Sequence, residues 1–266
     1  MPEKKPRPPV KVQRATNSST TSMEDALVAL IKRNEELVSL NKSKDEFIAI
    51  TSHQLRTPAT AVKQYLALVL EGYAEPLSDN QRLFLERAFE NNERQLRIVD
   101  DILRVAQLDL DKLNLIITRT DLRKVLHRAI ETVKNKLDRH QQTLELIEPA
   151  QPVWLRVDAE NLRLAFENIL ENASIYSDDG KKITVKLQGL KNNKAKITVI
   201  DEGIGINESD LPKLFQKFSR LNNPSSKTVS GTGLGLYFSK KILDLHGGNI
   251  KVRSAIGKGT IFSITI

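Results

Sequence analysis

The sequence has no cysteine among its 266 residues, which excludes disulfide bonds, thiolate metal sites and cysteine nucleophiles. Its absence fits a reducing compartment. No apolar run approaches the roughly 20 residues that a membrane-spanning helix needs. The opening residues, MPEKKPRPPV, lack the apolar core of a signal peptide, and no internal repeat is visible. These absences predict a cytoplasmic chain, either complete or the cytoplasmic part of a longer or membrane-associated protein.

Hydrophobic residues make up 39% of the sequence and charged residues 28%, which is typical of soluble domains, and the length allows two of them. Half of the net charge of +8 lies in the first fourteen residues. We therefore expect a disordered basic leader over residues 1–22, which can also bind an acidic partner or a membrane surface. A nucleic-acid-binding module is an alternative that predicts strongly salt-dependent binding, but no nucleic-acid partner is expected.

A long helix is predicted from about Ser22 to Glu71, where Gly72 and Pro76 end it. Its seam positions, in alternating steps of four and three from Met23 to Val69, are mostly apolar, which is the pattern of a coiled coil or bundle. Ser78 or Asp79 begins a second amphipathic helix. A hairpin of two such helices cannot bury both apolar faces alone, so we expect residues 23–110 to form a four-helix bundle in a homodimer.

The stretch FIAITSHQLRTPATAVKQYL holds His53 on the first of these helices. Its spacing from Thr51 and Leu55 places it roughly opposite the seam, so it should face solvent. Pro58 removes one backbone donor and crowds the carbonyl of Gln54, which predicts a kink beside the histidine. By itself this pattern is equally compatible with an ordinary exposed histidine.

From about residue 111 the pattern alternates between strands and helices. LNLIITRTDL is predicted as a strand, and the last helix spans Leu236 to His246. Between and after them the sequence predicts helices over 122–137 and 159–174 and strands over 143–147, 153–157, 182–190, 195–201, 249–254 and 260–266. This order predicts an α/β sandwich over residues 111–266, with a mixed sheet covered on one face.

Three stretches of this second domain carry chemistry. In NILENASIYS, Asn168 and Asn172 share a helix face one turn before Tyr176, and two carboxamide oxygens can bind a hard cation such as Mg²⁺. For the pair alone, an ordinary polar helix face is the favoured explanation. In DEGIGI, Asp201 ends a strand where a buried acceptor can hold an exocyclic amine, and Gly203 and Gly205 let a ring approach the backbone.

The third stretch, GTGLGL over residues 231–236, opens the last helix with free backbone N–H groups suited to phosphates. Each stretch alone is weak evidence. Ahead of GTGLGL lies LFQKFSRLNNPSSKTVS, whose turn-forming residues predict a mobile lid over a phosphate site. The order of all three stretches around the lid is what favours a nucleotide site.

The motifs SHQLRTP, NILENASIYS, DEGIGI, FQKF and GTGLGL, in this order, resemble the five boxes of sensor histidine kinases of bacterial two-component signalling. The resemblance covers essentially everything after the leader. It implies a phosphoacceptor and dimerisation hairpin followed by an ATP-binding domain of the GHKL, or Bergerat, type, the ATPase superfamily shared with gyrase, heat-shock chaperone and mismatch-repair proteins.

The resemblance implies that His53 accepts the γ-phosphoryl group of ATP and passes it to an aspartate of a response regulator receiver domain. It implies Mg²⁺ coordination by Asn172 with Asn168 nearby, adenine against Tyr176, and the adenine amine on Asp201. The other residues it implies for ATP binding are Gly203, Gly205, Phe215, Phe218, Arg220, Gly231, Thr232, Gly233, Leu234, Gly235 and Leu236. Thr57 matches the position that orients water for dephosphorylating the regulator, although it can be an ordinary helix threonine.

Two residues depart from the family's pattern. Gln54 stands where relatives commonly have an acid, so we expect it to position the imidazole without acting as a base, and autophosphorylation to be slower. Ile175 replaces a basic residue, a contact that Lys227 of the lid can supply. A nucleotide-binding scaffold or phosphatase with weak autokinase activity is the alternative function, and a simple hydrolysing ATPase is disfavoured because it leaves the hairpin without a purpose. The stimulus is expected to come through an upstream sensory partner or a missing sensor domain.

Overall fold

The computed structural model describes residues 17–109, 113–219 and 232–266. Its first helix, α1, spans Asn17–Leu70 and continues through Pro58. It begins five residues before the expected start at Ser22, so the end of the expected disordered leader is helical. Asn17 and Ser18 are as good at beginning a helix as Ser22 is. After Leu70 the chain turns at Gly72, whose φ of +91° favours glycine.

Helix α2 spans Asp79–Asp109, as the N-cap signal predicts. Ser78 and Gln81 form a reciprocal capping pair at its start. The Ser78 backbone N–H donates to Gln81 Oε1 at 2.9 Å, and the Gln81 N–H donates to Ser78 Oγ at 3.4 Å. These two bonds satisfy donors that a helix start leaves unpaired, and they fix where α2 begins.

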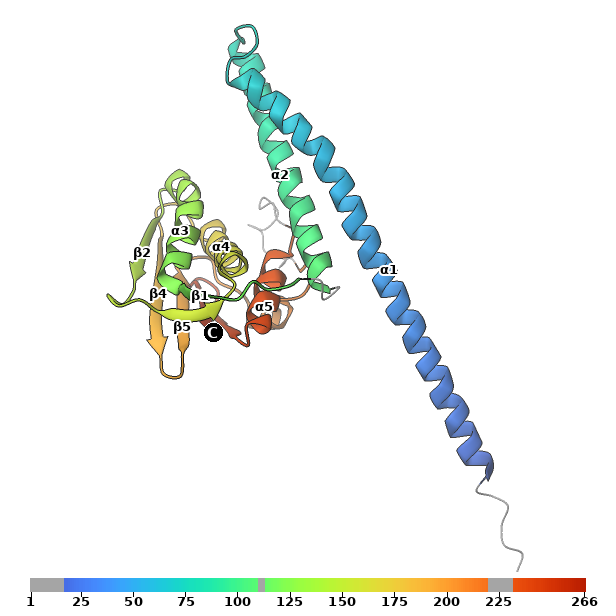
Figure 1. Ribbon diagram of the computed structural model, residues 1–266. Coiled ribbons are helices and arrows are strands. Elements are labelled where there is room, and N and C mark those ends of the chain that lie inside the picture. Colours follow the sequence, from blue (N-terminus) through green and yellow to red (C-terminus); the bar gives the residue numbers. More distant parts are fainter. Residues whose placement is uncertain (1–16, 110–112, 220–231) are drawn as a thin grey trace, which may run out of the picture. The chain divides into compact units, whose positions relative to one another are not determined.

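The second half of α1 and helix α2 form the expected hairpin and lie side by side (Figure 1). Arg56 Nε donates to Asp100 Oδ1 at 2.7 Å, and Lys63 Nζ lies 2.7 Å from Glu93 Oε1. Lys63 also lies 5.6 Å from the ring centroid of Phe89. Charged contacts of this kind, half exposed to water, align the two helices but contribute little stability each.

A small antiparallel sheet follows the hairpin, made of β1 (Thr118–Asp121) and β3 (Trp154–Val157). The predicted strand LNLIITRTDL is therefore too long, because only its last part pairs. The Ile116 N–H instead donates to the Asp158 carboxylate at 2.8 Å. Asp158 is also the residue that caps helix α4 (Ala159–Ile175). A side-chain acceptor takes the place of a strand partner there.

The main sheet has five strands in the order β2-β4-β5-β7-β6, with β2 parallel to β4 and the other pairs antiparallel. The strands are β2 (Thr143–Ile147), β4 (Lys182–Leu190), β5 (Lys194–Asp201), β6 (Asn249–Ser254) and β7 (Thr260–Thr265). The helices of this domain are α3 (Leu122–Arg139), α4, the short 3₁₀ helix η1 (Glu208–Lys213) and α5 (Gly235–Leu245). The fold predicted from the sequence, a helical hairpin followed by an α/β sandwich with a mixed sheet, is confirmed.

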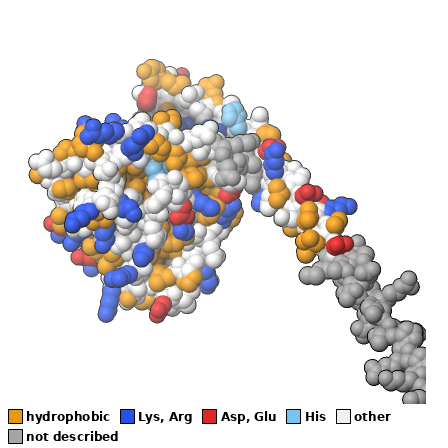
Figure 2. All heavy atoms as spheres, turned by 60° about the horizontal axis from the view of Figure 1, so that its bottom comes forward, with side chains coloured by type: hydrophobic (Ala, Val, Ile, Leu, Met, Phe, Trp, Pro, Cys, Tyr) orange, Lys and Arg blue, Asp and Glu red, His pale blue; other side chains and the backbone are white. Residues whose placement is uncertain are grey.

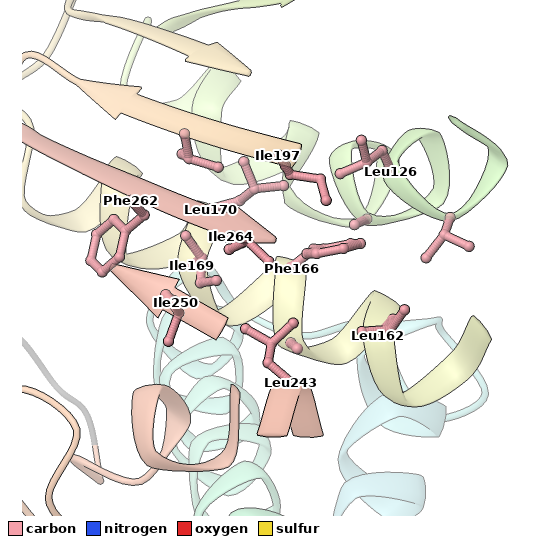
Figure 3. Packing of buried hydrophobic residues seen from close by; sticks show 14 of the residues in the cluster. Leu126, Leu162, Phe166, Ile169, Leu170, Ile197, Leu243, Ile250, Phe262 and Ile264 are labelled. Carbon is pink, nitrogen blue, oxygen red and sulfur yellow. The ribbon is translucent and has the colours of Figure 1, made fainter. Parts of the chain in front are cut away.

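The core of the α/β domain lies between the sheet and helices α3, α4 and α5 (Figures 1 and 3). Along β4 and β5 buried residues alternate with half-buried or exposed ones, because successive side chains of a strand point to opposite faces. Figure 3 shows Ile197 and Ile264 of the sheet pointing toward Phe166 and Leu170 of α4. This packing fixes α4 and α5, which carry two of the three predicted nucleotide motifs.

Candidate nucleotide and phosphoacceptor site

His53 is exposed on α1, as its position relative to the seam predicts, and so are Gln54 and Thr57. Ser52, the residue before His53, and Ala59, further along the same helix, are buried. The Thr57 hydroxyl donates to the His53 carbonyl at 3.4 Å. The imidazole is therefore held on a packed helix turn but remains open to an incoming group.

Asp201 is the buried carboxylate at the end of β5, 5% exposed. Its Oδ1 accepts the backbone N–H of Gly203 and that of Thr260, each at 3.0 Å. Burial raises the pKa of Asp201 to about 6, against the lowering effect of these two hydrogen bonds. The bonds orient the carboxyl group through one oxygen, and Oδ2 is the atom left to accept a hydrogen bond from a ligand.

The turn after Asp201 is closely packed against the end of α4. A Cβ on Gly203 would lie 2.3 Å from the Tyr176 carbonyl oxygen. Gly205 has a φ of +73°, and a Cβ there would lie 2.0 Å from the Ala255 carbonyl oxygen. The half-buried Tyr176 accepts the backbone N–H of Ile204 at 3.0 Å. The structure thus brings Tyr176, Asp201, Gly203 and Gly205 together, as one nucleotide site would require.

Asn168 and Asn172 are half-buried on the same face of α4. The Asn172 Nδ2 group donates to the Asn168 carbonyl at 2.7 Å, which leaves the Asn172 Oδ1 as the outward acceptor. The Asn168 Oδ1 would lie 3.1 Å from a Cβ on Gly235. The Asn168 carboxamide therefore lies beside the glycine that begins α5. Among the described residues no cluster of three or more His, Cys, Asp or Glu could hold a metal.

The glycine stretch before α5 is packed against the phenylalanine motif. Gly233 has a φ of +69°, and a Cβ there would lie 2.8 Å from the Phe218 backbone. Phe218 itself has a φ of +58° and a largely exposed side chain. Leu234 is buried, while Phe215, Thr232 and Leu236 are half-buried. Arg220, Lys227 and Gly231 lie outside the described residues.

Two acidic residues of α2 that the sequence analysis missed contact this region. Asp101 Oδ2 accepts the Thr232 hydroxyl at 2.9 Å, and burial raises the pKa of Asp101. Asp109 accepts the Tyr237 hydroxyl at 2.8 Å and pairs with Lys217. No local pattern singled them out among the many charges of α2, since only the fold brings them to α5.

A pocket lies beside the Asp101 contact, between α2, α4 and α5. Its lining residues are Asp101, Arg104, Val105, Asn168, Leu234, Gly235 and Phe238. It joins a carboxamide of the asparagine pair to the start of α5. Asn168 of the asparagine stretch and Leu234 and Gly235 of the second glycine stretch therefore line the same pocket.

Comparison with known families agrees with this geometry. The family described as histidine kinase-, DNA gyrase B-, and HSP90-like ATPase matches residues 157–266, which places the α/β domain among ATPases of that class. The His Kinase A (phospho-acceptor) domain matches residues 43–111, a range that includes His53. Since both domains stand in this order in one chain, the chain belongs to the sensor histidine kinases, as the resemblance predicted.

Similar proteins found by sequence are also histidine kinases. The circadian input-output histidine kinase CikA of Synechococcus elongatus is 31% identical over 246 residues, which cover 89% of this chain and 32% of CikA. The sensor histidine kinase WalK of Bacillus subtilis is 31% identical over 256 residues, which cover 91% of this chain and 39% of WalK. The chain spans well under half the length of either relative.

Solved structures show the same fold. Full-length ShkA in complex with AMPPNP has a TM-score of 0.69 at 21% identity, covering 83% of this chain and 45% of ShkA. The Acinetobacter baumannii histidine kinase AdeS has a TM-score of 0.57 at 24% identity, covering 80% of this chain and 96% of AdeS. Across the described residues, every helix is too short or too polar to cross a bilayer.

Proposed function

We propose that the chain transfers the γ-phosphoryl group of ATP to His53 and then to an aspartate of a response regulator receiver domain. One observation carries the proposal: an exposed histidine within a phosphoacceptor domain is followed, in the same chain, by an ATPase domain. We assign the phosphoacceptor role to residues 23–110, which would pair with a second copy, and nucleotide binding to residues 111–266. The stimulus would come from an upstream sensory partner or domain.

His53 would act as the nucleophile. One ring nitrogen of the neutral imidazole attacks the γ-phosphorus, the bond to the bridging oxygen breaks, and ADP leaves. The second ring nitrogen keeps its proton, and the Gln54 side-chain carbonyl can accept a hydrogen bond from it. An amide cannot take up that proton, so Gln54 would fix the tautomer without acting as a base.

The α/β domain would hold the nucleotide at two places. Asp201 would accept the adenine amine through Oδ2 while the ring lies against Tyr176, a role supported by the burial of the carboxylate and its fixed orientation. The phosphates would lie at the start of α5, near Gly233 and Gly235, where backbone N–H groups are available. Phe215 and Phe218 would border this part of the site. ShkA, a structure with the same fold, was solved with AMPPNP bound.

Asn172 fits Mg²⁺, because its Nδ2 group is already donating and its Oδ1 is an oxygen ligand. Bound with the nucleotide, Mg²⁺ would neutralise charge on the phosphates. Asn168, one turn earlier and beside Gly235, would hold the same region in place.

Thr57 supports a further activity, removal of the phosphoryl group from the regulator. It is exposed one helical turn after His53, where its hydroxyl can orient water toward a bound receiver. Its present hydrogen bond to the His53 carbonyl, at 3.4 Å, is long enough to be exchanged.

Incubation of the full chain with ATP labelled at the γ-phosphate tests the proposal. We expect acid-labile, alkali-stable label on the protein and its complete loss in His53→Ala. Label should pass to an added receiver domain of the same genome. Nucleotide binding without any label on the protein would refute the kinase activity.

Gln54 favours one second candidate, a nucleotide-binding scaffold or phosphatase that seldom phosphorylates itself. Gln54→Glu restores a group that can take up a proton, so it separates the candidates. If the wild-type chain is an active kinase, the variant should raise the labelling rate by less than about a hundredfold, the lower end of what general base catalysis contributes. A strong gain of label in the variant over a nearly unlabelled wild type would favour the scaffold.

A further inference from the structure

Gln142, which lies outside every motif described above, forms a buried hydrogen-bond network. It lies between α3 and β2 and is 6% exposed. Its Nε2 group is within hydrogen-bond distance of three carbonyl oxygens, those of Ser174 at 2.9 Å, Ser177 at 2.9 Å and Asp178 at 3.3 Å. Its Oε1 accepts the Ser174 hydroxyl at 2.6 Å. One carboxamide therefore connects to the chain on both sides of Tyr176.

These carbonyls belong to the end of α4 and the turn after it, where a helix leaves acceptors without partners. Buried acceptors without hydrogen bonds are costly, so the position of the turn depends on the groups that satisfy them. Backbone contacts hold the same two segments together. The Thr143 N–H donates to Lys181 at 3.1 Å, and the Gly180 N–H donates to His140 at 3.0 Å.

The turn that Gln142 holds also positions the segment after Asp201. The Tyr176 carbonyl oxygen accepts the Ile204 N–H at 3.0 Å, and it leaves no space for a Cβ on Gly203. The Gly203 N–H is one of the two donors that orient the Asp201 carboxylate. A displacement of the turn would therefore move both Tyr176 and the donor that aligns Asp201.

We propose that Gln142 is a positioning residue of the adenine pocket, which sets the distance between Tyr176 and Asp201 and so the preference for a purine with a 6-amino group. This inference rests on the proposed function of the site. The chemistry explains the residue type: only a carboxamide of this length donates to the carbonyls and also accepts from a hydroxyl. Leucine would remove the side-chain donor to the Ser177 carbonyl, whereas the Ser174 and Asp178 carbonyls also accept backbone N–H groups. Glutamate would place acceptors against acceptors.

The test compares ATP with the triphosphate of purine riboside, which lacks the 6-amino group. Both are titrated into the full-length wild-type chain, Gln142→Leu, Gln142→Asn and Ser174→Ala. Ser174→Ala is the matched control, since it removes one bond of the network but keeps the three donations to carbonyls. We expect the wild-type chain to prefer ATP by about tenfold or more, the size of one hydrogen bond to a charged group.

In Gln142→Leu the preference should fall to about twofold, because ATP binding weakens while analogue binding changes little. Gln142→Asn should give an intermediate preference, and it decides the matter if the leucine variant does not fold in a thermal melt. Ser174→Ala should keep the wild-type preference. Equal weakening of both nucleotides, or an unchanged preference in both Gln142 variants, would overturn the inference while the proposed function stands. A wild-type chain that binds neither nucleotide would overturn both.

Discussion

The helical hairpin and the α/β domain differ in how far their large apolar side chains are exposed to solvent. In the hairpin Tyr65 is 71% exposed and Phe84 69%, whereas Ile183, Ile197 and Ile264 of the sheet are fully buried. Figure 2 shows hydrophobic side chains at the surface of α1, interspersed with charged ones. The α/β domain can bury its core within one chain. The hairpin leaves part of its apolar surface exposed in the single chain, and under the proposed function a second copy covers that surface.

The largest effect should come from the core of the α/β domain. Phe166 is 2% exposed between α4 and the sheet, so Phe166→Ala should lower the free energy of unfolding by about 3–5 kcal/mol. Denaturant titration followed by the fluorescence of Trp154 measures this loss. It should not depend on protein concentration. A loss below about 1 kcal/mol would show that this core is not as self-sufficient as its burial indicates.

A substitution on the apolar face of the hairpin should instead change the affinity of the proposed dimer. Val62, a predicted seam position, is 47% exposed in the single chain. Val62→Glu would bring two like charges into the proposed interface and should weaken the dimer by at least about a hundredfold, as measured by sedimentation equilibrium. Gln64→Glu is the matched control, because Gln64 is exposed on the opposite side of the same helix turn. Equal effects of the two variants would contradict the assignment of the interface.

Asp201 should make the α/β domain sensitive to pH. Because burial raises its pKa to about 6, its contribution to stability is complete below the ordinary carboxyl pKa and is lost as the pH rises through about 6. The nucleotide-free chain should therefore lose on the order of 1–3 kcal/mol of unfolding free energy from this group between about pH 4 and 7. ATP affinity should change the other way, falling about tenfold from pH 7 to pH 5 as the carboxyl group protonates.

Asp201→Asn is the variant that checks both trends. It keeps the Oδ1 acceptor for Gly203 and Thr260 but cannot ionise, so its melting temperature should vary less with pH and exceed that of the wild type at pH 7. It should also lose most of its ATP affinity. A wild-type pH profile retained in the variant would assign the titration to another group.

The smallest effect should come from the contact that joins the two regions. Asp101 places a carboxylate against Thr232, next to the proposed phosphate site. Asp101→Asn keeps an acceptor for the hydroxyl but removes the charge, so ATP should bind about twofold to fivefold more tightly. Titration with ATP at low salt measures the change. Asp244→Asn, which alters an exposed pair with Lys240, should leave the affinity unchanged.

Local patterns accounted for most of the fold. The capping residue Ser78, the alternation in β4 and β5, and the glycine after α1 each act over a few residues, so their effects are visible in the sequence. The strand predicted before Asp121 was too long because a distant carboxylate, that of Asp158, takes the N–H of Ile116. That competition depends on the tertiary fold.

The candidate site also contains residues that could be recognised from local sequence and residues that could not. The spacing of Asn168 and Asn172, and the glycines of DEGIGI and GTGLGL, could be recognised because chemistry and local geometry coincide there. Asp101, Asp109 and Gln142 could not, since their partners lie between 32 and 131 residues away. The roles assigned to the site residues remain predictions for the experiments above.

The sheet order has a consequence for synthesis. Strand β7, Thr260–Thr265, pairs with β5 on one side and β6 on the other, so it is an interior strand although it is the last of the five strands in the sequence. Chains generally fold from the N-terminus as they emerge from the ribosome. Here the earlier strand β5 must keep one edge unpaired, and β6 has no strand partner, until β7 arrives. A nascent chain stalled before Thr260 should therefore expose a sheet edge that chaperones or other strands can bind.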